Sequence, residues 1–217
     1  MSGASSILFA QRLSTSSVRD AASWYLPYGL LSSNNRLISY QQFGFLSKCS
    51  TCTQLLDCVN DWTLSLHNRH SVDVIYFDFT KAFDSVSHPK LLHKLQAYGF
   101  CGDLLRILAN FLQDRTQRVV LPNGTSQFCS VISGVPQGSV LGPVLFLVYI
   151  NDIVDLFENT NVCTKLYADD IKIYLEITCD TDHATLQDST NKIYSWSNTW
   201  QLKLASNKLA SNNIYVS

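Results

Sequence analysis

The chain has 217 residues, of which 46% are hydrophobic and 15% charged, and its formal net charge is −1. This composition is typical of a folded globular protein with enough material for a sizeable core, and it excludes an intrinsically disordered chain. The near-neutral charge does not by itself indicate a nucleic-acid partner, because nucleic-acid-binding proteins normally carry a basic surface.

The cysteines and apolar runs bear on the compartment. Seven scattered cysteines do not form the even set of a disulfide framework. Cys49 and Cys52 have metal-ligand spacing, but no second clear pair follows, and a small core residue is the commoner role of cysteine. The start of the chain lacks a secretory signal, and its longest apolar run, 143–150, is far shorter than the ~20 residues of a membrane span. We therefore expect an intracellular protein in the nucleus or cytoplasm, with no membrane partner.

The chain opens with residues 1–35, which are rich in Ser and Asn and lack periodicity, so we expect a loose leader there. Apolar residues recur at helical spacing between positions 50 and 68, which predicts a helix with Ser50 or Thr51 as its N-cap.

A β-rich segment, 71–79 (SVDVIYFDF), predicts a buried strand after this helix. A helix is expected at 88–99, with Pro89 in its first turn and Gly99 just beyond its end. The segment 102–114 predicts a second, amphipathic helix.

Two hairpins are predicted in the second half of the chain. The first joins strands at 116–121 and 126–133 through PNGT, where Asn123-Gly124 is a strong turn signal. A segment punctuated by Gly and Pro then leads into an apolar helix.

The second hairpin is predicted at 162–177 (VCTKLYADDIKIYLEI), and a final helix at 182–200. The second strand of this hairpin alternates between an apolar face (Ile171, Ile173, Leu175 and Ile177) and another face (Lys172, Tyr174 and Glu176). Strands and helices that mix without strict βαβ alternation predict an α+β fold.

The second hairpin carries two adjacent carboxylates, Asp169 and Asp170, at its turn. On this pair alone, a functional site and an ordinary acidic surface turn are equally open. Asp78 shifts the balance, because an unpaired charge in an apolar strand would be costly. If the two strands are neighbours, Asp78 and Asp169 can share Mg²⁺ ions, which prefer hard oxygen ligands. Two such ions activate the attacking oxygen and stabilise the leaving oxygen in nucleotidyl transfer.

Three ordered motifs carry a family resemblance. The segments 77–88 (FDFTKAFDSVSH), 133–153 (SGVPQGSVLGPVLFLVYINDI) and 167–170 (YADD) closely resemble the palm motifs of reverse transcriptases. The upstream ISYQQFGF and the linking segments resemble the non-LTR, LINE-type retrotransposon branch. The resemblance implies a right-hand polymerase palm, an antiparallel sheet packed on helices, with part of the fingers.

This resemblance divides the chain into an unassigned leader at 1–35, partial fingers and palm at 36–210, and a truncated tail at 211–217. Nothing in the leader matches the family's fingers segment whose arginine contacts the triphosphate, and Cys49 stands where the family tends to have an arginine. The sequence also breaks off where a thumb is expected to begin. We therefore expect a fragment, and the missing basic segments would explain the near-neutral charge.

The resemblance assigns the metal ligands. Asp78 would bind metal with help from the backbone carbonyl of Phe79, and Asp169 would be the second shared ligand, while Asp170 would have a less direct role. The implied cofactor is a pair of Mg²⁺ ions, with Mn²⁺ as a possible substitute.

Further roles follow by motif position. Phe83 would lie under the incoming sugar and exclude a 2′-hydroxyl, with plain core packing as the alternative. Gln137 and Gly138 would lie against the nucleotide and template, Gln137 through amide hydrogen bonds and Gly138 through close backbone approach. The alternative is a simple turn. Asp84 is interpreted as structural, capping the following helix.

Two assignments rest on single positions. Tyr167 would lie near the primer terminus, with structural packing almost equally open. Lys208 resembles a lysine that protonates the leaving pyrophosphate, and a solvated surface lysine is an equal alternative.

The implied function is that of an RNA-directed DNA polymerase, a nucleotidyltransferase whose partners are an RNA template, a DNA primer and dNTPs. One alternative is a catalytically inactive, truncated retroelement remnant or a nucleic-acid-binding module with the same fold. Another is a different palm enzyme, such as an RNA-dependent RNA polymerase or a nucleotide cyclase, but Phe83 and the YADD context argue against both.

Overall fold

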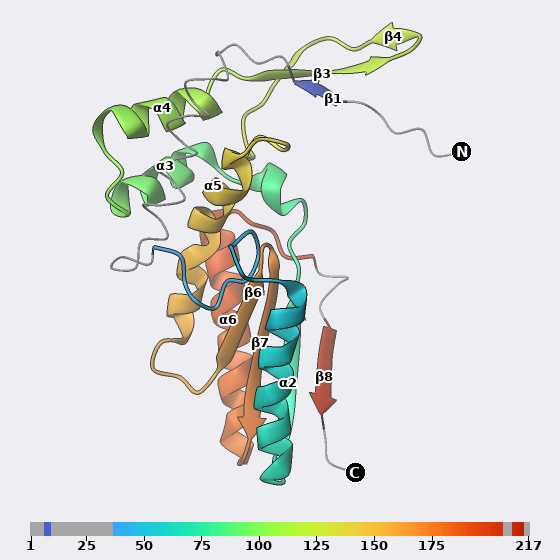
Figure 1. Cartoon of the computed structure of the whole chain (residues 1–217), viewed down its shortest axis with the longest axis vertical. Coiled ribbons are helices and arrows are strands. Elements are labelled where there is room, and N and C mark those ends of the chain that lie inside the picture. The colour runs from blue at the N-terminus through green and yellow to red at the C-terminus, as the bar shows by residue number, and fades with distance from the viewer. Residues whose placement is uncertain (1–6, 10–36, 206–209, 215–217) are drawn as a thin grey trace.

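The computed structural model describes residues 7–9, 37–205 and 210–214. Its centre is a four-stranded sheet of order β6-β7-β2-β8 (Figure 1). The strands are β2 (Ser71–Phe77), β6 (Cys163–Tyr167), β7 (Asp170–Ile177) and β8 (Ala210–Ile214). All neighbouring strands are antiparallel. The predicted α+β fold with an antiparallel sheet is confirmed, and β6 and β7 form the second predicted hairpin.

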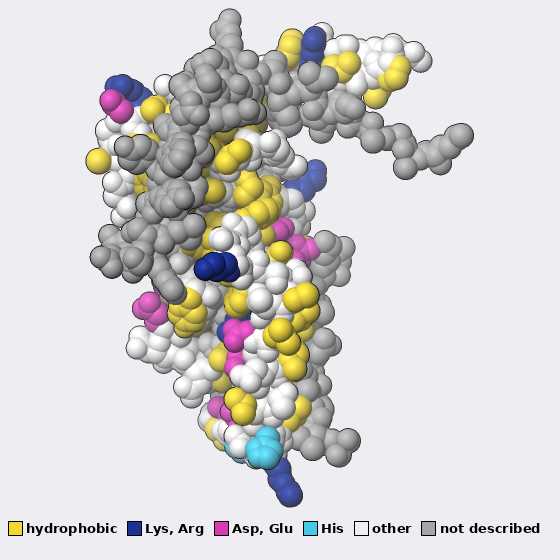
Figure 2. Space-filling view, in the orientation of Figure 1, with side chains coloured by type: hydrophobic (Ala, Val, Ile, Leu, Met, Phe, Trp, Pro, Cys, Tyr) yellow, Lys and Arg dark blue, Asp and Glu magenta, His cyan; other side chains and the backbone are white. Residues whose placement is uncertain are grey.

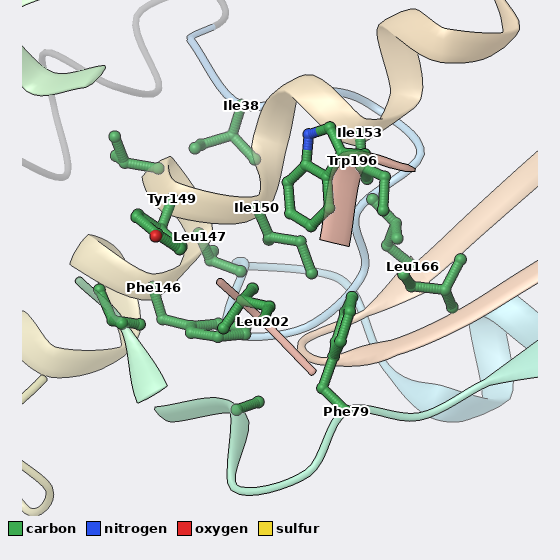
Figure 3. Close-up of a cluster of buried hydrophobic side chains, with 14 of the residues drawn as sticks. Ile38, Phe79, Phe146, Leu147, Tyr149, Ile150, Ile153, Leu166, Trp196 and Leu202 are labelled. Carbon is green, nitrogen blue, oxygen red and sulfur yellow. The ribbon is translucent and has the colours of Figure 1, made fainter. Parts of the chain in front are cut away.

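Helices α5 (Leu141–Ile150) and α6 (Asp180–Trp200) cover one face of the sheet, and the main core lies between them and the strands. Ile171 and Ile173 of β7 point into this core, together with Trp196 of α6. Figure 3 shows part of the cluster, with Phe79 just beyond the end of β2. Nearly all of α5 is buried, as expected of a helix that is apolar on every side. A short 3₁₀ segment, η2 (Asn151–Phe157), follows it.

Helix α2 (Thr51–His67) covers the opposite face of the sheet, and its N-cap is Ser50, as predicted. The Ser50 hydroxyl accepts a hydrogen bond from the backbone N–H of Thr53 at 3.1 Å, and the Thr53 hydroxyl accepts one from the N–H of Ser50 at 2.8 Å. This reciprocal pair is a capping box, which satisfies donors that the first turn of a helix leaves unpaired.

The apolar residues that predict helix α2 are largely not the ones it buries. The helix turns Gln54 and Cys58 to the sheet. Four apolar side chains on its outer face are exposed, namely Leu55, Leu56, Val59 and Leu64 (Figure 2).

The sheet face under α2 explains this orientation, because it is amphipathic. The Tyr174 hydroxyl donates a hydrogen bond to Asp61, and the Lys172 ammonium lies 3.6 Å from the Cys58 sulfur. Polar groups that leave water need such partners. As a result, β7 is buried on both faces rather than on the apolar face alone.

The segment between β2 and α5 builds the other end of the molecule. After the short 3₁₀ helix η1 (Ala82–Ser85) come α3 (His88–Ala97) and α4 (Gly102–Leu112). Both helices were predicted. Pro89 lies in the first turn of α3, and Gly99 follows its end with φ +88°.

A second sheet projects from this end (Figure 1). Strand β3 (Thr116–Leu121) pairs with β4 (Gly124–Thr125), β5 (Cys129–Ser130) and β1 (Ile7–Phe9). Of the predicted second strand, 126–133, only β5 forms, and β4 lies within the predicted PNGT connection. The predicted turn at Asn123-Gly124 is therefore wrong by one residue. Leu121 pairs with Gly124, so Pro122 and Asn123 form the turn. Proline favours the first turn position because its φ is already fixed there.

Strand β1 lies within the predicted leader, and the rest of that leader is outside the described residues. No helix among the described residues is both long enough and apolar enough to span a membrane.

Candidate active site

The pairing of β2 with β7 brings the two predicted metal-binding segments together. Phe77, the last residue of β2, lies opposite Ile171 in β7. Asp78 follows Phe77 directly, and Asp169 and Asp170 directly precede Ile171. Adjacent strands of a sheet lie about 4.7–4.9 Å apart. The structure thus meets the condition on which the predicted site depends, that these two strands are neighbours.

Asp169 lies on a two-residue turn. Tyr167 of β6 pairs with Asp170 of β7, so Ala168 and Asp169 form the connection. Ala168 has φ +56° and is buried. A left-handed conformation costs a non-glycine residue about 1–2 kcal/mol, so surrounding contacts must hold this turn.

The three aspartates differ in exposure. Asp78 and Asp169 are half-buried, whereas Asp170, the first residue of β7, is exposed. The less direct role of Asp170 stays a prediction.

The backbone of Phe79 is also oriented toward the β7 side. Phe79 and Leu204 form an antiparallel bridge, in which the Ala205 N–H donates to the Asp78 carbonyl at 2.9 Å and the Thr80 N–H donates to the Lys203 carbonyl at 2.8 Å. In a bridge of this kind the flanking residues make the hydrogen bonds, and the peptide groups of the bridged residue point to the other edge. The carbonyl of Phe79 therefore points to the edge on which β7 lies.

This donor set suits a hard divalent cation, since it consists of carboxylate and carbonyl oxygens. Within the described residues, no group of three or more His, Cys, Asp or Glu side chains is arranged to hold a metal ion. Cys49 and Cys52 therefore belong to no such metal-binding group among the described residues. Mg²⁺ is commonly bound through one or two carboxylates together with substrate phosphates, so a pair of aspartates fits it without a third protein ligand.

Phe83, in η1, lies between the core and the segment before α2. Its ring stacks on Phe146 with centroids 4.2 Å apart, and the ring of Phe45 meets it edge-on at 6.0 Å. The side chain is half-buried. This placement allows both predicted roles, a contact with substrate and core packing.

Gln137 and Gly138 lie on an exposed loop that is fastened to η1. The Gln137 amide donates to Asp84 Oδ1 at 2.6 Å, and the Ser133 hydroxyl donates to the Asp84 carbonyl at 2.9 Å. Gly138 has φ +77°, and open space surrounds the position where a Cβ would lie.

Asp84 was predicted to cap the helix after it, and this is wrong. The N-cap of α3 is Ser87, and the Asp84 side chain instead accepts the hydrogen bond from Gln137. Asp84 lies too early, inside η1, to reach the first N–H groups of α3.

The last two predicted residues are placed differently. Tyr167 is half-buried at the end of β6, next to the turn that carries Asp169. Lys208 lies outside the described residues.

Sequence reasoning missed Gln42, whose buried side chain hydrogen-bonds the backbone of Ala168. Its neighbour Gln41 is the same residue type, so the sequence does not show which of the two side chains would contact the turn. Gly44 was the one available signal, because a glycine often marks close backbone approach.

Comparison with known proteins agrees with this geometry. Residues 27–212 match the profile of the family described as "Reverse transcriptase (RNA-dependent DNA polymerase)". The RNA-directed DNA polymerase from mobile element jockey of Drosophila melanogaster is 31% identical over 177 residues, covering 78% of this chain and 19% of that protein. The probable RNA-directed DNA polymerase from transposon X-element of the same species is 30% identical over 178 residues, covering 80% of this chain and 19% of that protein. This chain thus spans about a fifth of the length of these relatives.

Solved structures show the same fold at low sequence identity. An apo telomerase from Candida Tropicalis superposes with a TM-score of 0.67 and 14% identity, over 95% of this chain and 42% of that one. The telomerase of the same organism in complex with a TWJ fragment of telomeric RNA gives a TM-score of 0.66 and 16% identity, over 94% of this chain and 34% of that one. With the palm motifs in order, the two aspartate segments on neighbouring strands and a family match over most of the sequence, the chain belongs to the reverse transcriptase (RNA-dependent DNA polymerase) family.

Proposed function

We propose that this chain is the RNA-directed DNA polymerase domain of a non-LTR retrotransposon, which extends a DNA primer on an RNA template with dNTPs. The observation that carries the proposal is the register of β2 and β7, which sets Asp78 beside the turn of Asp169. The match to the family of RNA-dependent DNA polymerases supports RNA as the template, and a telomerase solved with an RNA fragment shares the fold. Copying RNA would place the protein in the nucleus or cytoplasm. Residues 36–210 would form the partial fingers and palm, with 1–35 and 211–217 outside them.

The aspartates would hold the divalent ions of the reaction. Asp78 and Asp169 are the proposed ligands of two Mg²⁺ ions, or of Mn²⁺, with the Phe79 carbonyl as an additional donor and Asp170 in support. Bound there, the ions supply activation of the primer 3′-hydroxyl and charge stabilisation at the leaving pyrophosphate.

Other residues would position the substrates. The ring of Phe83 would exclude a 2′-hydroxyl from the incoming sugar. Gln137 would offer its amide to the nucleotide or template, and Gly138 would let that backbone approach closely. Tyr167 would lie near the primer terminus. Lys208 would donate a proton to the leaving pyrophosphate.

The experiment that tests the proposal is Mg²⁺-dependent extension of an oligo(dT) primer on poly(rA). We expect extension by the parent chain and none by Asp169→Ala, because the variant lacks a metal ligand. The turn leaves Asp169 half-buried, so the variant should keep the parent's circular dichroism spectrum.

A matched control is Asp103→Ala, which removes a carboxylate that is 82% exposed on α4 and should leave extension unchanged. Equal extension by the Asp169→Ala variant and the parent would contradict the proposal. A folded parent chain that extends no primer would instead identify an inactive member of the family.

A further inference from the structure

The segment before α2 lies along the outer edge of β6. The Phe43 N–H donates to the Leu166 carbonyl at 2.8 Å, and the Leu166 N–H donates to the Gln41 carbonyl at 2.8 Å. β6 is the terminal strand in the sheet order, so this parallel bridge pairs backbone groups that an edge strand otherwise leaves open. The bridge also brings the next residues to the end of β6, where the turn carrying Asp169 begins.

Gln42 holds that turn through its side chain. Its Oε1 accepts hydrogen bonds from the Ala168 N–H at 2.9 Å and from the Gly44 N–H at 2.7 Å. Its Nε2 donates to the Ala168 carbonyl at 3.4 Å. The residue is only 2% exposed, so water does not substitute for these bonds. One buried amide therefore engages both backbone polar groups of Ala168.

Gly44 brings the segment into direct contact with the turn. A Cβ on Gly44 would lie 2.3 Å from the Ala168 nitrogen and 3.0 Å from the Gln42 Oε1. Real Cβ atoms do not approach backbone atoms so closely, so a side chain here would push the turn away. The absence of a Cβ at Gly44 is what permits the hydrogen bonds of Gln42.

The far end of the same segment is fixed to the palm by Asn151. The Asn151 Oδ1 accepts from the Ser39 N–H at 2.8 Å, and its Nδ2 donates to the Leu37 carbonyl at 2.6 Å. Gln42 therefore acts from a support that is anchored independently of the turn. That anchoring lets it oppose the strain of Ala168, whose φ of +56° an alanine rarely adopts.

We propose that Gln42 is a positioning residue, which fixes the backbone of Ala168 and thereby the carboxylate of Asp169 for nucleotidyl transfer. The consequence for catalysis rests on the proposed polymerase function. The fixing of the Ala168 backbone does not rest on that function, because it follows from the contacts of Gln42 and Gly44 with Ala168.

The test compares Gln42→Met with Gln41→Met. Methionine keeps the length and shape of glutamine but cannot accept the two N–H groups. Gln41 is the matched control, since it contributes to the bridge only through its backbone and its side chain accepts from Ser39. Gln42→Glu is the conservative variant, because a carboxyl group that burial keeps protonated can accept from both amides through one oxygen and donate to the Ala168 carbonyl through the other.

The first readout is amide hydrogen exchange at Ala168, which needs no activity. Loss of buried hydrogen bonds should speed exchange in Gln42→Met on the order of tenfold or more, while Gln41→Met and Gln42→Glu stay close to the parent. Unchanged exchange at Ala168 in Gln42→Met would overturn the proposal, even if the parent extends no primer and the polymerase function itself fails.

The second readout is the split between kcat and KM. If Gln42 positions Asp169, Gln42→Met should lower kcat on the order of tenfold with little change in KM for dNTP, because the interaction it supports is made in the transition state. Faster exchange with an unchanged kcat would overturn the positioning role and leave Gln42 as a structural residue. If Gln42→Met unfolds, Gln42→Glu replaces it in both readouts. We expect the amide of Ala168 to stay protected from exchange in Gln42→Glu, and a loss of that protection would contradict the role of Gln42 as the acceptor.

Discussion

At the scale of a single residue, Phe83 packs against the core while part of its ring stays exposed. Phe146 lies flat against one side of its ring at 4.2 Å, and Phe45, itself 57% exposed, meets the ring edge-on. Core contacts fix the orientation of the ring, while its partial exposure leaves an edge for a ligand. A rigid aromatic group of this kind can discriminate by steric exclusion because it cannot rotate away.

We expect Phe83→Ala to raise the incorporation of ribonucleotides relative to deoxynucleotides. The variant should also lose stability on the order of 3 kcal/mol, because it removes the ring stacked on Phe146. Primer extension with each nucleotide type measures the ratio, and Phe83→Leu serves as the control that keeps much of the apolar volume. An unchanged ratio would refute the steric role and leave Phe83 as a core residue.

Lys94 is a buried charge that no predicted role requires. Its ammonium donates to the Tyr149 carbonyl and, at 2.6 Å, to Asp152 Oδ1, and it lies 3.6 Å from the centroid of the Trp200 ring. Burial lowers the pKa of Lys94 to about 8, although the neighbouring Asp152 acts in the opposite direction. Desolvation therefore outweighs the ion pair at this site.

This pKa predicts a dependence of stability on pH. Because the folded pKa of Lys94 is about 8 and its ordinary value is 10.5, the unfolded chain binds more protons between these two values. The free energy of unfolding should therefore rise with pH in that window, by up to about 1.4 kcal/mol per pH unit. Urea unfolding at two pH values, about 7.5 and 9.5, should show the parent gaining about 2 kcal/mol relative to Lys94→Met. Parallel pH profiles for the two proteins would contradict the assignment.

At the scale of an element, the loop from 133 to 139 depends on two glycines for different reasons. A Cβ on Gly134 would lie 2.8 Å from the Asp84 Cα, and the residue has φ +91°. A Cβ on Gly138 would meet nothing within 4 Å, although its φ is +77°. The first glycine permits the close packing of the loop on η1, whereas the second makes no such packing contact with the described residues and leaves its face open to the proposed substrate.

We expect Gly134→Ala to destabilise the chain on the order of 3 kcal/mol or more, through a backbone collision added to conformational strain. Gly138→Ala should cost only about 1–2 kcal/mol and should reduce primer extension more than it reduces stability. Urea unfolding and primer extension on both variants give the comparison. Equal losses of stability would mean that the contact with Asp84 relaxes at little cost.

Helix α2 shows where prediction from the sequence ends for an element. Its existence and its Ser50 cap follow from local spacing and local hydrogen bonds, so they could be predicted. Which side it buries could not, because that depends on the partner surface. The polar groups of Tyr174 and Lys172 face the helix, so it presents Asp61 and Cys58 and leaves Leu56 68% exposed.

At the scale of the whole molecule, the order of the motifs was enough to predict the palm, but the sequence alone did not place Asp78 next to Asp169. That adjacency comes from the register of β2 and β7, which the burial of Ile75, Phe77, Ile171 and Ile173 fixes through tertiary contacts. Gln42 escaped prediction for a similar reason, since its partner Ala168 is distant in sequence. A short-range pattern carries no information about such partners.

The charge of the whole molecule predicts how it binds a primer–template duplex. The net charge of −1 means that 16 Lys and Arg residues are balanced by 17 Asp and Glu residues, so we expect few phosphate contacts. Proteins with 6–10 such contacts lose about 10³–10⁵ in affinity between 50 and 200 mM salt, and for about three contacts we expect a loss of roughly 50-fold or less. Fluorescence anisotropy with a labelled duplex measures this, and a loss above 10³-fold would reveal a concentrated basic patch.

The pairing of β2 with β7 also has a consequence for the timing of synthesis. Phe77 pairs with Ile171, about 90 residues later in the chain. A ribosome that adds about 5–20 residues per second needs on the order of 5–20 s to make the intervening segment. During this interval β2 lacks the strand that covers one of its edges, and Asp78 has been made while Asp169 has not. The nascent protein therefore carries the first of its proposed metal ligands for several seconds or more before the second has been made.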